Sequence, residues 1–133
     1  MTTRYVIGLD SSTQSTKAIV WDRNGNPCAE ARAPHTISQP QPDRFEQDAA
    51  EWWKAASTAL RAVTAQVDPA LIDGIAIANQ RETMALLDAE GVPVAPATLW
   101  LDSRAVGYTR LLDAELGAGR LHQITGKPVD VTP

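Results

Sequence analysis

Hydroxyl side chains gather in a short stretch, from Asp10 to Lys17, that separates two apolar runs near the start of the chain. Hydroxyls and backbone N–H groups in a tight turn can donate to phosphate oxygens, and an acid at a strand end can hold Mg²⁺ directly or through water. We therefore predict a phosphate-binding turn with Asp10 as the metal ligand. Its predicted phosphate ligands are Ser12, Thr13, Gln14, Ser15 and Lys17. The alternative is a polar hairpin whose hydroxyls bond their own backbone.

A second polar cluster follows an apolar run, Ile72 to Ala78, that is predicted to be a buried strand. Gln80, Arg81 and Glu82 come just after this run. Ligands of open α/β sheets bind beyond the carboxyl ends of strands, so a substrate is expected here. An Arg beside a Glu offers the donors and acceptors that a neutral polyhydroxylated molecule needs. The alternative is that Arg81 and Glu82 pair with each other or with a helix end.

An aromatic and an acid, Trp100 and Asp102, lie on the same side of a predicted extended segment. This pairing suits a sugar, because an indole covers the apolar C–H face while a carboxylate accepts from hydroxyls. The alternative is a core Trp100 and an Asp102 that caps the next helix. We expect the two polar clusters, remote in sequence, to face one cleft.

The first half of the chain must position these groups through a sheet and one helix. Apolar runs predict strands at 5–9, 17–21 and 28–33, which would form an antiparallel meander. A proline-rich, polar stretch predicts a surface loop at 34–47. A helix should follow, with Asp48 and Glu51 as reciprocal caps, an end before Pro69 and a buried stripe at Trp52, Ala56, Leu60, Val63 and Val67. The strand at 72–78 should then join the sheet in parallel.

The second half is predicted to be less regular. A strand at 83–88 should end in a turn at 89–91, and two prolines limit 92–101 to an irregular edge strand. Helical spacing predicts a helix at 103–116 that ends at Gly117. Its predicted inward residues are Val106, Leu111, Leu112 and Leu116. The remainder, 119–133, is predicted to be irregular.

Composition excludes several classes of protein. The 133 residues carry a net charge of −4, and their scattered basic residues give no footprint for nucleic acid or an anionic membrane. No segment approaches the roughly 20 apolar residues of a membrane span. Cys28 is the only cysteine, which excludes an intrachain disulfide and suits the cytoplasm. His35 and His122 have no partner at ligand spacing, so we assign both to solvent or to a local hydrogen bond.

Taken together, the motifs resemble those of the FGGY carbohydrate kinases, members of the actin and sugar-kinase superfamily. The resemblance rests on the stretch from Gly8 to Lys17 and on four landmarks in the family's order: 45–48 before the helix, 79–83, 100–104 and 124–126. It implies an α/β fold with an actin-like, ribonuclease H-like mixed sheet flanked by helices. It also implies ATP and Mg²⁺ as cofactors, Asp10 at the metal, Thr13 facing the phosphates, and a sugar pocket lined by Gln80, Arg81, Glu82, Trp100 and Asp102.

Different residues of the sequence point to different acceptors within that family. Arg81-Glu82 looks like the glycerol and polyol kinases, whereas Asp102 after Trp100 and the serine-rich first motif look more like xylulokinases. Ser12 stands where the family often has glycine, which could re-aim the phosphate turn. We favour a ketopentose such as xylulose, with glycerol or another polyol as the alternative.

The length of the chain bears on its activity. Residues 1–133 resemble the amino-terminal part of the family's first domain, and the second domain, with the adenine pocket and the general base, would lie downstream. A non-catalytic actin-like module that binds nucleotide is the alternative from another class. A homodimer is left open as one option.

Overall fold

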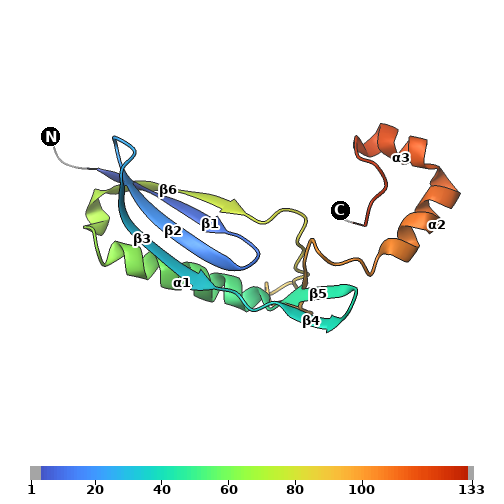
Figure 1. Cartoon of the computed structure of the whole chain (residues 1–133), viewed down its shortest axis with the longest axis horizontal. Coiled ribbons are helices and arrows are strands. Elements are labelled where there is room, and N and C mark those ends of the chain that lie inside the picture. The colour runs from blue at the N-terminus through green and yellow to red at the C-terminus, as the bar shows by residue number, and fades with distance from the viewer. Residues whose placement is uncertain (1–3, 132–133) are drawn as a thin grey trace.

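The computed structural model describes residues 4–131, which form a mixed sheet flanked by helices (Figure 1). The main sheet has four strands in the order β3-β2-β1-β6. These strands are β1 (Tyr5–Ser11), β2 (Ser15–Asp22), β3 (Pro27–Pro34) and β6 (Ile72–Asn79). The first three form an antiparallel meander, and β6 lies beside β1 in parallel. The predicted sheet is therefore confirmed.

One face of this sheet packs against helix α1 (Ala49–Thr64) to make the hydrophobic core. Side chains alternate along β1, so Ile7 and Leu9 are buried towards the helix, while Val6 on the opposite face is 49% exposed. The core is completed by Ala18, Val20, Ala29, Ala59 and Val63. The opposite face, which carries Asp10, is open in this chain.

Helix α1 begins at its predicted cap. The Asp48 carboxylate accepts a hydrogen bond from the Ala50 N–H at 2.9 Å. The Glu51 carboxylate is not the predicted reciprocal cap, because it accepts from the Thr36 N–H at 2.9 Å and so ties the helix to the chain that leaves β3. The helix ends at Thr64, before Pro69 as predicted.

The two adjacent tryptophans of α1 point in different directions. Trp52 is only half-buried, in contrast to its predicted burial, and its indole N–H donates to the side-chain oxygen of Gln47 at 2.9 Å. The fully buried positions of the helix are Ala55, Ala59 and Val63. Trp53 is exposed, as expected for one member of an adjacent pair.

A second, three-stranded sheet stands where a loop was expected. Its strands are β4 (Ser38–Gln41), β5 (Arg44–Gln47) and β7 (Ala97–Thr98), in the order β4-β5-β7. The prediction of an irregular segment at 34–47 is therefore wrong. Pro40 is tolerated because β4 is an edge strand with β5 as its single neighbour in the sheet.

The chain between β6 and β7 is less regular than predicted. The expected strand at 83–88 forms only two isolated bridges, from Met84 to Thr98 and from Leu87 to Pro93. The expected turn is confirmed, because the Gly91 N–H donates to the Asp88 carbonyl at 3.1 Å.

The described chain ends with two helices, α2 (Val106–Leu116) and α3 (Ala118–Thr125). A short 3₁₀ turn, η1 (Pro69–Leu71), lies between α1 and β6. Asp102 does not cap α2, which starts at Val106 after Ala105. The predicted inward residues of α2 are about half exposed, and α3 lies where irregular chain was predicted. Figure 1 shows both helices standing away from the main sheet. Within residues 4–131, none of the helices is long and apolar enough to cross a membrane.

Candidate active site

The two polar clusters meet at one edge of the main sheet. Strands β1 and β6 run in parallel with Ser11 opposite Asn79, so both strands end together. The Gln80 N–H continues the pairing by donating to the Ser11 carbonyl at 3.0 Å. The chain that leaves β6 therefore starts beside the turn that leaves β1, which is the arrangement expected for a ligand site in an α/β sheet.

Several of the predicted phosphate ligands already have partners, either within the turn or on β3. Both the backbone N–H and the hydroxyl of Ser12 donate to the Ser15 carbonyl, at 3.0 and 3.1 Å. The buried Ser15 hydroxyl accepts from the Arg32 guanidinium at 2.6 Å, and Lys17 pairs with Glu30 at 3.0 Å. These contacts fix the shape of the turn.

Thr13 and Gln14 form the apex of this turn. Gln14 is exposed, and the Thr13 hydroxyl accepts from the indole N–H of Trp100 at 2.9 Å. Accepting this bond does not use the hydroxyl's own proton, which is left to donate to a phosphate oxygen. The bond also joins a residue of the predicted phosphate site to a residue of the predicted sugar site.

His35 supports the turn from the buried side. Its Nε2 lies 2.9 Å from the Thr16 hydroxyl, and its backbone N–H donates to the Gln14 carbonyl at 2.8 Å. This agrees with the expected local hydrogen bond.

Asp10 lies on the open face of the sheet, directly opposite Lys17 in the β1–β2 register. Its side chain is exposed and lines a hollow of about 320 Å³ together with Lys17, Ile19 and Trp21. Asp10 is not part of any group of three or more metal-ligating side chains in the described chain. A single carboxylate nevertheless fits Mg²⁺, which usually keeps several waters and is bound by one or two carboxylates plus substrate phosphates.

Three of the five predicted sugar residues line a different hollow, of about 230 Å³, whereas Gln80 and Arg81 are not among its lining residues. Glu82, Trp100 and Asp102 line it, with Met84, Leu99 and Arg104 beside them. In the described chain, Asp10 and these three residues therefore line two separate hollows and not the single cleft that we expected. The hydrogen bond from Trp100 to Thr13 joins the two sides.

Glu82 has the most unusual backbone of the site. Its φ of 61° is the only positive φ of a non-glycine residue in the described chain. Such a conformation costs of order 1–3 kcal/mol and is found mainly at functional sites. The Glu82 carboxylate lies 3.3 Å from the Arg81 guanidinium and 3.5 Å from the Lys127 amine. Arg81 and Glu82 thus pair with each other, and Glu82 still faces the hollow.

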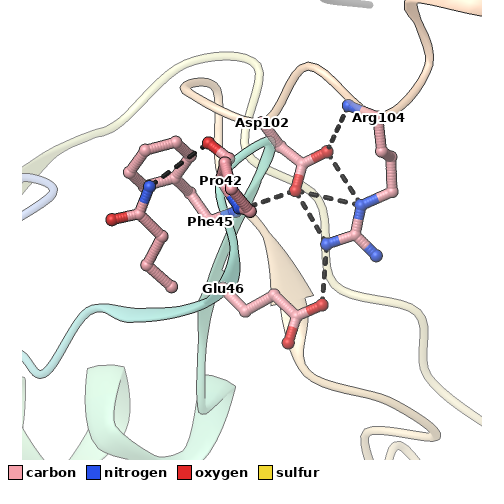
Figure 2. A network of polar contacts seen from close by, with 6 residues as sticks. Pro42, Phe45, Glu46, Asp102 and Arg104 are labelled. Carbon is pink, nitrogen blue, oxygen red and sulfur yellow. Dashed lines mark hydrogen bonds and ion pairs between the residues drawn. The ribbon is translucent and has the colours of Figure 1, made fainter.

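Asp102 is buried under the same hollow, with its carboxylate already bonded (Figure 2). It accepts from the Phe45 N–H at 2.9 Å and from the Arg104 guanidinium at 2.7 Å. Arg104 also reaches Glu46 at 2.7 Å. The bonds from Arg104, with those from the Phe45 and Arg104 N–H groups, lower the pKa of Asp102 despite its burial.

Residues 5–132 match the model of the N-terminal domain of the FGGY family of carbohydrate kinases. The chain belongs to this family. The expected actin-like fold is confirmed by solved FGGY kinases: the xylulose kinase of Rhodospirillum rubrum superposes with a TM-score of 0.91 and 30% identity, over 97% of this chain and 27% of that one.

Curated FGGY relatives differ in the acceptor that their names give. The chain is 34% identical over 131 residues to the apulose kinase of Pectobacterium atrosepticum, which covers 98% of this chain and 26% of the relative. It is 39% identical over 129 residues to the glycerol kinase of Natranaerobius thermophilus, and this match covers 95% of this chain and 26% of the relative. The chain thus spans about a quarter of the length of the curated FGGY kinases that it matches.

Three residues at this candidate site were not predicted from the sequence. Arg104 donates to both Asp102 and Glu46, and the buried Gln47 contacts both polar clusters. Glu46 and Gln47 belong to a landmark of the family resemblance, but a loop was predicted there. The signal that could have found all three is the family resemblance, because Arg104 likewise ends the landmark at 100–104.

Replacing Arg104 by methionine should destabilise the full-length FGGY protein by about 1.5–3 kcal/mol, the range of hydrogen bonds to charged groups. The reason is that the buried Asp102 carboxylate would lose its main donor. We would measure the midpoint of chemical unfolding, with Arg110→Met on the exposed part of α2 as the matched control.

The same network gives a pH dependence. Because the folded-state pKa of Asp102 is lowered, its stabilising contribution is present above its unfolded pKa of about 4 and is lost as the pH falls through the folded value. The difference in the free energy of unfolding between the native protein and Arg104→Met should therefore become smaller below about pH 4. A difference that stays constant from pH 7 to pH 3 would contradict this assignment.

Proposed function

We propose that this chain is the amino-terminal part of the first domain of a kinase that transfers the γ-phosphoryl group of ATP to a hydroxyl of a sugar or polyol. The observation that supports the proposal is the Trp100 to Thr13 hydrogen bond, because it joins the aromatic that we propose for sugar stacking to the tip of the turn that we propose for phosphate. In-line phosphoryl transfer needs the acceptor hydroxyl and the terminal phosphate side by side.

Each cluster has its own part in this proposal. Asp10 would hold Mg²⁺, which neutralises charge on the transferring group when it is bound. Thr13 would donate its hydroxyl proton to a phosphate oxygen, with Gln14 and the rest of the turn around it. Glu82 would accept from acceptor hydroxyls, with Arg81 as a donor beside it.

Asp102 and Gln80 take a supporting part in the same pocket. Both Asp102 oxygens are bonded to Phe45 or Arg104, so Asp102 would set the floor of the hollow and position Trp100. Gln80 bonds to Thr83 and Gln47, and would hold the start of the Arg81-Glu82 segment.

For the acceptor we propose a ketopentose such as xylulose, with glycerol or another polyol as the second candidate. The xylulose kinase likeness and the serine-rich turn favour the first, and Arg81 beside Glu82 favours the second. A second domain downstream would supply the adenine pocket and the general base. A cytoplasmic location and a homodimer stay predictions.

A substrate panel tests the proposal. The full-length protein should phosphorylate one class of acceptor with a kcat/KM at least tenfold above the others when xylulose, ribulose, glycerol and longer polyols are compared with ATP and Mg²⁺. The readout is acceptor-dependent ADP release together with the mass of the phosphorylated product. Nucleotide binding without turnover on any acceptor would instead support the non-catalytic actin-like module.

A further inference from the structure

A closed ring of hydrogen bonds connects the phosphate turn to the sugar pocket. The ring starts at Gln47, whose side-chain N–H donates to the Thr13 carbonyl at 2.7 Å. The Gln47 side-chain oxygen accepts from the Gln80 amide at 3.3 Å. Gln80 accepts from the Thr83 hydroxyl at 3.1 Å, and Thr83 accepts from the Trp100 N–H at 3.2 Å. The Trp100 indole returns to the Thr13 hydroxyl at 2.9 Å.

The direction of every bond in this ring follows from groups that have a single role. The Thr13 carbonyl can only accept, and the Trp52 indole N–H, 2.9 Å from the Gln47 oxygen, can only donate. These two contacts fix the orientation of the Gln47 amide. The amide of Gln80 must then donate to Gln47 and accept from Thr83. Each donor in the ring therefore meets an acceptor.

Gln47 is the buried hub of this ring. It is 2% exposed and lies at the end of β5, directly before Asp48, the cap of α1. Its side chain bonds to Thr13 on the phosphate side and to Gln80 on the sugar side, and it also accepts a hydrogen bond from the Trp52 indole.

We propose that Gln47 is a positioning residue that fixes the spacing between the phosphate turn and the acceptor pocket. This inference rests on the proposed kinase function and adds a residue that acts through Thr13 and Gln80. Phosphoryl transfer depends steeply on the distance between the acceptor oxygen and the phosphorus, and a displacement of about 1 Å can cost about 100-fold in rate. A ring that spans both sides is a means of holding that distance.

Two substitutions of Gln47 separate its two contacts. Gln47→Glu keeps an oxygen for Trp52 and Gln80 but removes the donor to Thr13, so it should lower kcat about 10- to 100-fold and raise KM for ATP, with KM for the acceptor within twofold of native. Gln47→Met removes both contacts and should raise both KM values. Gln66→Met, at an exposed glutamine near the end of α1, is the matched control and should leave all three parameters unchanged.

A less disruptive substitution, which leaves Gln47 in place, keeps the test decisive if the Gln47 variants fold poorly. Trp52→Phe retains the ring but removes the indole N–H that orients the Gln47 amide. It should lower kcat about threefold to tenfold while the melting temperature stays well above the assay temperature. Thermal unfolding of each variant is recorded beside its kinetics.

The outcomes distinguish this inference from the proposed function. Active native protein, together with folded Gln47→Glu and Trp52→Phe whose kcat and KM values equal those of the native protein, would overturn the positioning role and leave the kinase function intact. The variants could instead yield less folded protein, with the kinetics of the folded fraction equal to those of the native protein. That result would also overturn the positioning role, and it would make Gln47 a purely structural residue. Native protein inactive on every acceptor would overturn the proposed function and this inference with it.

Discussion

Replacing Asp10 by alanine in the full-length kinase should lower kcat by about 100- to 10,000-fold while the acceptor still binds, because charge stabilisation at the transferring phosphoryl group would be lost. Asp10 ends the part of β1 that faces the open side of the sheet, opposite Lys17 and next to the phosphate turn. Its carboxylate is exposed, so it does not support the core. A large effect on rate would therefore come from chemistry and not from unfolding.

The Mg²⁺ dependence makes this prediction specific. Asp10→Asn keeps the shape of the side chain but removes its charge, and it should shift the Mg²⁺ concentration needed for half-maximal activity to higher values. Asp113→Ala, on the exposed surface of α2, should have no effect on either quantity. Calorimetric titration of the acceptor and initial rates at varied Mg²⁺ are the measurements. A kcat within threefold of native for Asp10→Ala would refute the metal role.

The main sheet could be predicted because its signals are local and agree with one another. The apolar run of β1, the Asn-Gly turn before β3 and the Asp48 cap of α1 each depend on a few neighbouring residues. The parallel pairing of β6 followed from its place after a helix, and the structure confirms it.

The second sheet could not be predicted because its pairing is not local. Strand β5 is four residues long and gains its second partner only from β7, beyond the whole of α1 and β6. Prolines flanking such short strands indicate a loop to any local interpretation. The residues that this sheet places at the site, Glu46 and Gln47, were missed for the same reason.

Helix α2 shows a different limit. Its helical spacing was recognised, but a periodic stripe does not say which surface covers it, and Leu111 and Leu116 are more than half exposed in the described chain. At the candidate site, the residue types predicted which residues lie near one another. They did not predict which of these side chains are already hydrogen-bonded within the protein. Asp102 was expected to accept from a sugar, whereas its oxygens are bonded to Arg104 and Phe45.

Replacing Glu82 by alanine should weaken binding of the acceptor by about 10- to 100-fold, which corresponds to the loss of one or two hydrogen bonds to a charged group. Glu82 faces the hollow beside Trp100, and its side chain is 19% exposed, so a ligand can reach its carboxylate. The ion pairs with Arg81 and Lys127 hold that carboxylate in one orientation. Calorimetric titration of the acceptor measures the effect, with Glu90→Ala at the exposed turn as the control.

The left-handed backbone of Glu82 allows binding and stability to be separated. Glycine adopts a φ of 61° without the penalty that a Cβ imposes, so Glu82→Gly should not lower the melting temperature, because the partly exposed ion pairs that it removes contribute little. The same variant should bind the acceptor as weakly as Glu82→Ala. A residue kept in a strained conformation for function shows this combination of retained stability and lost affinity. An unchanged acceptor affinity in both variants would remove Glu82 from the pocket, and a large drop in melting temperature would make its role structural.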